Sequence, residues 1–400
     1  ALRRRARAVG RVTRLRDQLR RQPATAWILY GGTFVNRFGS FVMPMLAIFL
    51  TRRGYSPSEA GFAIGCYGFG LLIASAAGGY LADRIGRRNT IVLSMFTSAA
   101  AMLALSQARS YSSVVILAVF AGATTELYRP ASHALIGDIV PPQDRVIGFA
   151  LYRFAVNLGF AFGPATAGFL ANRSFFLIFA ADAATSVAYG IIAIFALPQG
   201  LRTYSKEERT GEAVRTALSD SRVVAFLAAA MLAATVEYQM GSTFALHVTR
   251  EGFSAATYGA LISINGILII LFELIIIARV QRMDPRPVIA IGYLLNGIGF
   301  GLTGLAHTVP VLAATVVVWT TAEMLYSPMG GAHMTQLAPE RYRGRYMGLL
   351  VTTWSLGMIA GPTLGTILFE RHEAVLWSAC AVLGVVSALL VMPKRHQSAV

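Results

Sequence analysis

The sequence predicts an all-α integral membrane protein in which twelve transmembrane helices form two six-helix, pseudo-symmetric halves. Three observations predict it: the composition, the regular spacing of uncharged runs, and an internal repeat. Of the 400 residues, 55% are hydrophobic and only 14% are charged. In a soluble protein, roughly a quarter of all residues are charged. The composition therefore indicates a chain that lies mostly within a membrane.

Twelve apolar runs with few or no charges follow one another along the chain. Each is near or above the roughly 20 residues that a helix needs to cross about 30 Å of hydrocarbon. The first six expected spans are 24–50, 57–82, 89–107, 111–140, 146–171 and 174–197, and the last six are 223–248, 255–278, 287–306, 309–338, 346–369 and 374–393.

The net charge of +16 is distributed unevenly between the two sides of the predicted membrane. If the N-terminus is cytoplasmic, the inside segments hold 26 of the 35 Lys and Arg residues, the outside segments 6 and the spans 3. The positive-inside rule predicts such an asymmetry. We therefore expect a multi-pass protein of the cell (inner) membrane with both termini cytoplasmic. Because membrane topology explains the positive charge, we expect no nucleic-acid partner.

Polar segments divide the chain into five parts. They are a basic cytoplasmic N-terminal segment (1–23), an N-terminal six-helix half (24–197), a cytoplasmic linker (198–222), a C-terminal six-helix half (223–393) and a cytoplasmic tail (394–400). The N-terminal segment holds nine arginines and one acid, and we interpret it as an anchor that orients the first span. A basic helix lying on anionic lipid, or a transit peptide, is the alternative; no cleavable signal peptide is expected.

The sequence aligns with itself when it is shifted by 198 residues. TRRGYS at 51–56 aligns with TREGFS at 249–254, Leu158-Gly159 with Leu356-Gly357, and Gly163-Pro164 with Gly361-Pro362. Six spans is an even number, so both copies insert with the same orientation. A substrate site is then expected near the midplane between the two halves.

The residues between the second and third expected spans form the most specific motif, GGYLADRIGRRNT at 78–90. Its matching positions are Gly79, Asp83, Arg84, Gly86, Arg87 and Arg88. Through this motif, the twelve spans and the paired halves, the sequence resembles the major facilitator superfamily over its whole length. In that family the loop latches the halves on the cytoplasmic side in the outward-facing state. The resemblance implies that Arg84 bonds an acid at the inner end of span four, here Asp138; an ordinary positive-inside loop is the alternative.

Two further segments resemble motifs of the same superfamily. NLGFAFGPATAG at 157–168 is similar to the GP motif of its proton antiporters, through Gly159, Gly163, Pro164 and Gly168. Such pairs also occur in membrane helices purely for packing. AEMLYSPMGG at 322–331 is similar to multidrug and peptide-type members, in which the acid that corresponds to Glu323 takes part in proton coupling or substrate recognition.

Ionisable residues within the expected spans are functional candidates, because their burial in a membrane is costly. We expect Glu126 to pair with Arg129 and Arg37 to balance further negative charge, although a purely structural pair is the alternative. Glu237 and Glu323 have no basic partner in their own half. Burial favours the neutral form of such a carboxyl, which suits a proton carrier. The proton-coupling candidates are Glu323, Glu237, Glu126, Arg129 and Arg37, with Glu323 favoured; Asp182 and Glu273 stay open between structural and functional roles.

The substrate cavity is expected to include Tyr238, Tyr326, Phe34, Arg153 and Asn157. The leading functional hypothesis is a proton-coupled transporter that works by alternating access and exports lipophilic or cationic compounds in exchange for protons. A proton symporter for a peptide, sugar or organic anion, and a lipid exporter, are the alternatives. No motif of a membrane enzyme is present, and Cys66 and Cys380 lie inside spans. We expect a monomer that needs no metal or cofactor other than protons, with a small-molecule substrate.

Overall fold

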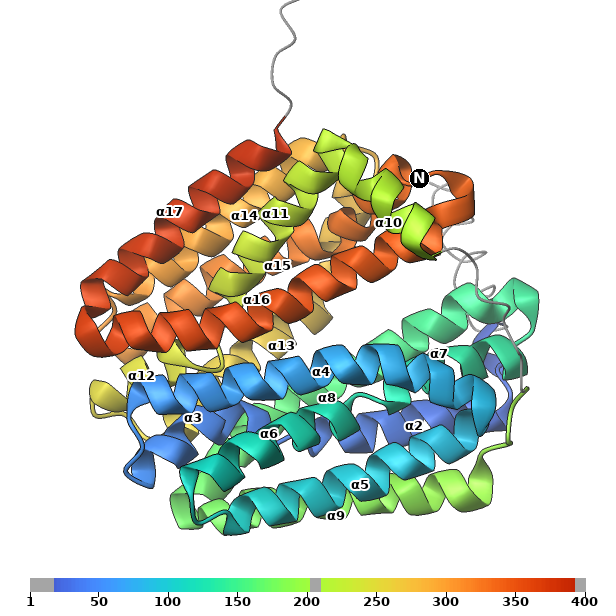
Figure 1. The fold of residues 1–400 in the computed structure, drawn as a ribbon, viewed down its shortest axis with the longest axis horizontal. Helices are drawn as coiled ribbons and strands as arrows, with labels where there is room; N and C mark the ends of the chain where they lie inside the picture. Colours follow the sequence, from blue (N-terminus) through green and yellow to red (C-terminus); the bar gives the residue numbers. More distant parts are fainter. Residues whose placement is uncertain (1–17, 202–209, 393–400) are drawn as a thin grey trace, which may run out of the picture.

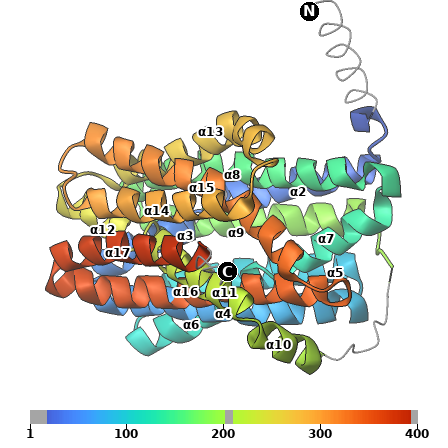
Figure 2. The ribbon, with the colours of Figure 1, turned by 90° about the horizontal axis from the view of Figure 1, so that it is seen from above.

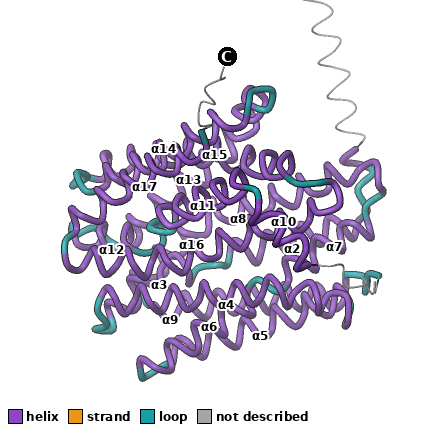
Figure 3. Tube along the Cα trace, turned by 45° about the horizontal axis from the view of Figure 1, so that its top comes forward, coloured by secondary structure: helices purple, strands orange, loops and turns teal. Residues whose placement is uncertain are grey.

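The computed structural model describes residues 18–201 and 210–392. The expectations for residues 1–17 of the basic segment, for residues 202–209 of the linker and for the tail from 393 onward lie outside these ranges. Every regular element in the described ranges is a helix, and none is a strand (Figure 3). The prediction of an all-α membrane protein is confirmed.

Eight α-helices build the N-terminal half, here the N half, and seven follow α10 in the C-terminal half, the C half. The N half contains α2 (Ala24–Phe38), α3 (Val42–Arg52), α4 (Pro57–Arg84), α5 (Arg87–Gln107), α6 (Tyr111–Thr125), α7 (Tyr128–Ile139), α8 (Arg145–Arg173) and α9 (Phe175–Ala196). After α10 (Thr210–Ser219), the C half contains α11 (Ser221–Glu237), α12 (Thr243–Arg250), α13 (Ala255–Val280), α14 (Pro285–Thr303), α15 (Val309–Leu337), α16 (Arg343–Arg371) and α17 (Glu373–Val391).

Ten helical segments of the described chain are long and apolar enough to cross a membrane, or eleven when the bent pair α10 and α11 is counted as one span. The segments expected at 223–248 and 287–306 are the two that differ. The first is divided into α11 and α12, and α11 itself has 17 residues. The second is α14, a helix of 19 residues in which Arg286 and Asn296 lower the mean hydropathy. The count of twelve spans stays a prediction.

The internal repeat is visible in where the helices begin. Helices α4, α5, α6, α8 and α9 begin 198 residues before α13, α14, α15, α16 and α17, respectively. Local sequence explains the shared starts: Ser56 and Ser254 each cap the following helix with the side-chain oxygen. Just before these caps, Gly54 and Gly252 have φ of 90° and 84°, a backbone conformation that glycine adopts without strain.

The bundle has two ends, which we call the linker end and the far end. At the linker end α2 begins at Ala24, α9 ends at Ala196 and α11 begins at Ser221; at the far end α3 ends at Arg52 and α12 ends at Arg250. In Figure 1 the N half (blue to green) and the C half (yellow-green to red) approach each other around α3 and α12 and diverge toward α7 and α10. Figure 2 shows the same long helices from above.

The halves touch along two helix pairs, α4 with α16 and α8 with α13. Glycines make the approach possible: a Cβ on Gly61 would lie 2.4 Å from the Pro362 carbonyl oxygen, and one on Gly168 would lie 2.4 Å from that of Ala255. Both glycines lie in the part of their helix nearest the far end. The protein is therefore in a conformation closed at the far end, with the linker ends of the two halves apart.

Candidate functional site

A cluster of charged side chains lies where α6 passes into α7. Glu126 stands at the break between these helices, and its Oε1 lies 2.6 Å from Arg37 Nη2 of α2. Its Oε2 lies 3.5 Å from Arg129 Nε. The side chains of Arg37 and Glu126 are only 15% and 17% exposed. The expected pairing of Glu126 with Arg129 is therefore present, but the closer partner comes from the first span.

The GP segment packs α8 against both halves. A Cβ on Gly159 would lie 2.6 Å from the Phe38 amide nitrogen, and one on Gly163 would lie 2.8 Å from the Phe38 carbonyl oxygen. Pro164 lies inside α8, and its carbonyl oxygen is 2.2 Å from where a Cβ on Gly259 of α13 would stand. These small residues let backbones approach closely, as is typical of membrane helices.

Asp182 of α9 has a structural task that the sequence left open. Its Oδ2 accepts hydrogen bonds from the backbone amides of Phe41 (3.1 Å) and Val42 (3.2 Å). These amides lie at the beginning of α3, where the first N–H groups of a helix have no carbonyl partner within the helix. The Asp182 side chain accepts their hydrogen bonds instead. The first span can therefore break between α2 and α3. An acid within an apolar run was the only sequence signal for this role.

Two carboxyl groups of the C half, the buried Glu237 and the partly buried Glu323, are bound by neutral groups. Tyr326 Oη donates to Glu237 Oε2 at 3.2 Å, and Asn265 Nδ2 donates to Glu323 Oε2 at 2.9 Å. Asn265 also bonds the Thr320 hydroxyl at 3.1 Å, so its orientation is set from two sides. Within the described ranges neither carboxyl forms an ion pair. Asn265 is not among the residues predicted for the site, and its one sequence signal is a polar side chain in the apolar α13.

The expected aromatic residues divide into two groups. Tyr326 stacks on Trp354 with ring centroids 5.8 Å apart, and Tyr238 meets the same indole edge-on at 6.3 Å. Tyr326 thus joins this aromatic group to Glu237. Phe34 instead stacks on Phe38 at 6.1 Å in the N half. The structure brings Tyr238 and Tyr326 together around one tryptophan, while Phe34 belongs to another cluster.

An ion pair joins the halves between α8 and α13, where Arg153 Nη2 contacts Glu273 Oε1. Beside it lies a cavity of about 30 Å³ whose lining also includes Asn157 and Glu323. This volume suffices for about one water molecule. We call the contact between α8 and α13 the seam between the halves. Three residues predicted for the site line the seam cavity, namely Arg153, Asn157 and Glu323, and Glu273 lines it as well.

The motif loop between α4 and α5 lies at the linker end, where the two halves are apart. The contact of Arg84 with Asp138 that the resemblance implies belongs to the opposite, outward-facing state and stays a prediction. Asp138 Oδ2 lies 3.0 Å from Arg87 Nε and accepts the Leu201 backbone N–H at 2.8 Å. Arg84 instead donates to Tyr80 Oη at 2.6 Å. In this conformation the partner of Asp138 is Arg87, not Arg84. The cause is the turn at Gly86 (φ 93°), after which Arg87 begins α5 and points inward, while Arg84 ends α4 on the exposed side.

A family model, the Major Facilitator Superfamily, matches residues 29–278 and 221–399. The chain belongs to the major facilitator superfamily. Similar proteins from Bacillus subtilis (strain 168) are the uncharacterized MFS-type transporter YttB (28% identical, over 94% of this chain and 97% of the relative) and multidrug resistance protein 2 (23%, over 90% and 92%).

Other members of the superfamily extend the comparison. A Na(+), Li(+), K(+)/H(+) antiporter from Planococcus maritimus is 24% identical over 84% of this chain and 87% of the relative. The crystal structure of the nucleoside transporter NupG aligns with a TM-score of 0.82 at 14% identity, over 92% of this chain and 99% of that one. The chain thus has the fold of a multi-span membrane transporter.

Proposed function

We propose that this protein exports lipophilic or cationic compounds in exchange for protons, by alternating access between its two halves. The linker end would face the cytoplasm, as the distribution of Lys and Arg predicts. Each proton that enters down 100 mV supplies about 2.3 kcal/mol, and each pH unit about 1.4 kcal/mol. One or two protons would therefore support roughly hundredfold accumulation.

Two carboxyl groups of the C half support this function: Glu237 is buried and Glu323 is partly buried. Glu237 and Glu323 are held by the neutral groups of Tyr326 and Asn265. A carboxyl bound in this way can gain or lose a proton without breaking an ion pair. When ionised and facing a cavity, the same group attracts a cation. Proton and cationic substrate would then bind alternately, which couples their opposite movements.

The seam supplies a link between protonation and conformation. Arg153 contacts Glu273 across the halves, and Glu323 lines the same cavity. An ionised Glu323 would compete with Glu273 for this guanidinium, while a protonated Glu323 would leave the ion pair between α8 and α13 intact. We infer that proton binding to Glu323 favours the conformation described here and proton release favours its opposite.

The three arginines within the spans bear on the alternative, proton symport of an organic anion. Arg37 and Arg129 both contact Glu126, and Arg153 contacts Glu273. Arg37 and Arg129 share one carboxylate and Arg153 has its own, so an anionic substrate would have to compete with these acids for the guanidinium groups. This arrangement favours exchange with a cation over symport with an anion.

Relatives support the same choice. Two of the similar proteins are named as a multidrug resistance protein and as a cation/H⁺ antiporter, and both align over most of this chain. We infer from these relatives only the class of reaction, which is exchange of a compound for protons. Cationic dyes are therefore the first compounds to test as substrates.

The test uses proteoliposomes that contain the purified protein and a cationic dye such as ethidium, under an imposed pH gradient. Glu323→Gln should abolish gradient-driven dye movement while leaving dye binding measurable. Glu340→Gln, which changes an 88% exposed glutamate at the linker end, is the matched control and should transport normally. Unchanged gradient-driven transport by Glu323→Gln would show that this residue is not the proton carrier.

A further inference from the structure

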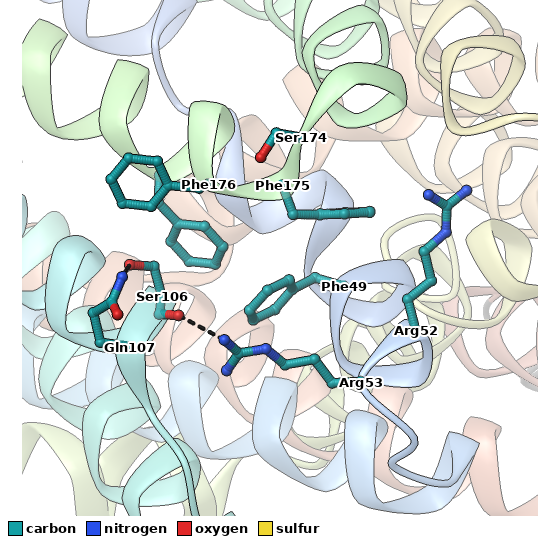
Figure 4. A pocket seen from close by; sticks show the side chains of 9 residues that line it. Phe49, Arg52, Arg53, Ser106, Gln107, Ser174, Phe175 and Phe176 are labelled. Carbon is teal, nitrogen blue, oxygen red and sulfur yellow. Dashed lines mark hydrogen bonds between the residues drawn. The ribbon is translucent and has the colours of Figure 1, made fainter.

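A hollow of about 460 Å³ lies at the far end of the N half, between the end of α3, the end of α5 and the beginning of α9 (Figure 4). Its walls combine aromatic rings, among them Phe49, Phe175 and Phe179, with the two arginines Arg52 and Arg53. No carboxylate is among the nine residues that line it. We call this hollow the far-end pocket. It shares no residue with the seam cavity around Glu323.

Both arginines of the far-end pocket are positioned by aromatic rings. The Arg52 guanidinium carbon lies 5.2 Å from the centre of the Phe175 ring, and that of Arg53 lies 4.7 Å from the centre of Phe49. Arg53 also donates to the backbone carbonyl oxygens of Ala108 (2.7 Å) and Ser106 (2.8 Å). Within the described ranges Arg52 donates no hydrogen bond, and neither arginine has an acidic partner. Two exposed positive charges thus lie beside aromatic rings at the rim of the far-end pocket, without an anionic partner in the described ranges.

The second copy of the repeat shows what the first copy lacks. Arg250 corresponds to Arg52, and Glu373 stands where the first copy has Phe175. Arg250 Nη1 lies 2.9 Å from Glu373 Oε2, and the same carboxylate accepts a hydrogen bond from Trp377 Nε1 at 3.1 Å. The C half therefore neutralises its arginine with its own side chain. In the N half that carboxylate is replaced by a phenyl ring.

The difference between the copies indicates a missing ligand with defined chemistry. We propose that the far-end pocket binds an amphiphilic organic anion, with its carboxylate, sulfonate or phosphate group on Arg52 and its apolar body against the phenylalanine rings. Guanidinium groups bind such oxyanions through two parallel hydrogen bonds. The volume is within the range of sites for small organic ligands. The headgroup of an anionic lipid and a soluble aromatic acid share this chemistry.

This site is independent of the proposed proton exchange, so its test measures binding alone. The full chain would be placed in phosphatidylcholine nanodiscs, with anilinonaphthalene sulfonate as the probe and phenylnaphthylamine, which has the same rings without the sulfonate, as its neutral companion. Arg52→Gln should weaken sulfonate binding about tenfold, the scale of one charge-assisted contact. Arg173→Gln is the matched control, because Arg173 ends α8 at the same end and also lies over a phenyl ring, Phe169, at 4.8 Å.

A second pair of variants tests the comparison between the copies. Phe175→Glu installs the carboxylate of the C half and should abolish sulfonate binding, whereas Phe175→Gln, of the same size but uncharged, should bind more tightly than Phe175→Glu. If thermal unfolding shows that Arg52→Gln does not fold, the two Phe175 variants still test whether the far-end pocket binds an anion. The proposal is overturned if Arg52→Gln and Arg173→Gln bind the sulfonate equally well, or if the neutral companion binds to the wild type as tightly as the sulfonate.

The source of the anion is decided by changing the lipid. Phosphatidylglycerol added to the nanodiscs should displace the sulfonate from the wild type if a lipid headgroup is the natural occupant. Its general repulsion of the probe is measured on Arg52→Gln discs of the same composition. If phosphatidylglycerol weakens sulfonate binding no more in the wild type than in Arg52→Gln, the natural occupant is a soluble acid. Displacement by the lipid and lack of displacement both support an anion site.

Discussion

Gly266 of α13 and Ala161 of α8 bring the two halves into backbone contact, because a Cβ on Gly266 would lie 2.4 Å from the Ala161 Cα. Gly266→Ala should therefore destabilise the far-end-closed conformation by about 1–3 kcal/mol, the usual cost of overpacking. Gly348→Ala is the control, since a Cβ at Gly348 meets no atom within 4 Å.

The measurement for this variant is the distance between spin labels at the linker end. Gln143→Cys and Glu340→Cys place labels on exposed turns of opposite halves, in a background in which Cys66 and Cys380 are replaced by alanine. Gly266→Ala should enrich the population with a short distance, in which the linker ends have approached. An unchanged distance distribution would contradict the assigned role of this contact.

The Arg153–Glu273 ion pair should couple the halves energetically. Arg153 is half exposed, so we expect an interaction energy of about 1 kcal/mol in a double-mutant cycle. Arg153→Gln and Glu273→Gln should each shift the label distance in the same direction, and the double variant should add little to either. Fully additive shifts would mean that the two side chains act independently.

Two arginines of the motif loop, Arg84 and Arg87, should contribute differently to stability. Arg87 is 7% exposed and pairs with Asp138, whereas Arg84 is exposed and contacts Tyr80. Arg87→Gln should lower the free energy of unfolding by about 2 kcal/mol, because the partly buried Asp138 loses its charged partner. Arg84→Gln should lower it by less than about 0.5 kcal/mol. Chemical unfolding in detergent measures both, and a larger loss for Arg84→Gln would contradict the observed pairing.

Asp182 should matter for the shape of the first span. Asp182→Ala removes the acceptor of two buried amides and should cost about 2 kcal/mol of unfolding free energy. Asp182→Asn keeps an acceptor oxygen and should cost clearly less. Equal losses in the two variants would show that the negative charge, rather than the hydrogen bonds to Phe41 and Val42, stabilises α3.

The fold could be predicted because its signals are local or repeated. Apolar runs and their turns mark the helices, and the 198-residue offset recurs in where those helices begin. The breaks could not be predicted in the same way. The gap between α2 and α3 depends on Asp182, which is far away in sequence, and composition alone does not distinguish a broken span from a straight one.

The site could be predicted only in part. An acid in an apolar helix is visible in the sequence, so Glu237, Glu273 and Glu323 were found. Their partners come from other helices: Tyr326, Arg153 and Asn265. In this conformation Asp138 pairs with Arg87, which begins α5 after the turn at Gly86, and the direction of that turn depends on packing.

Exchange of substrate for protons through Glu323 is tested most directly by measuring the proton movement itself. Proteoliposomes that enclose the pH indicator pyranine would receive a pulse of the transported dye, with no imposed gradient. We expect protons to move opposite to the dye in the wild type and in Glu340→Gln, and we expect this movement to be lost in Glu323→Gln. Protons that move in the same direction as the dye, or that still move in Glu323→Gln, would contradict proton exchange through Glu323.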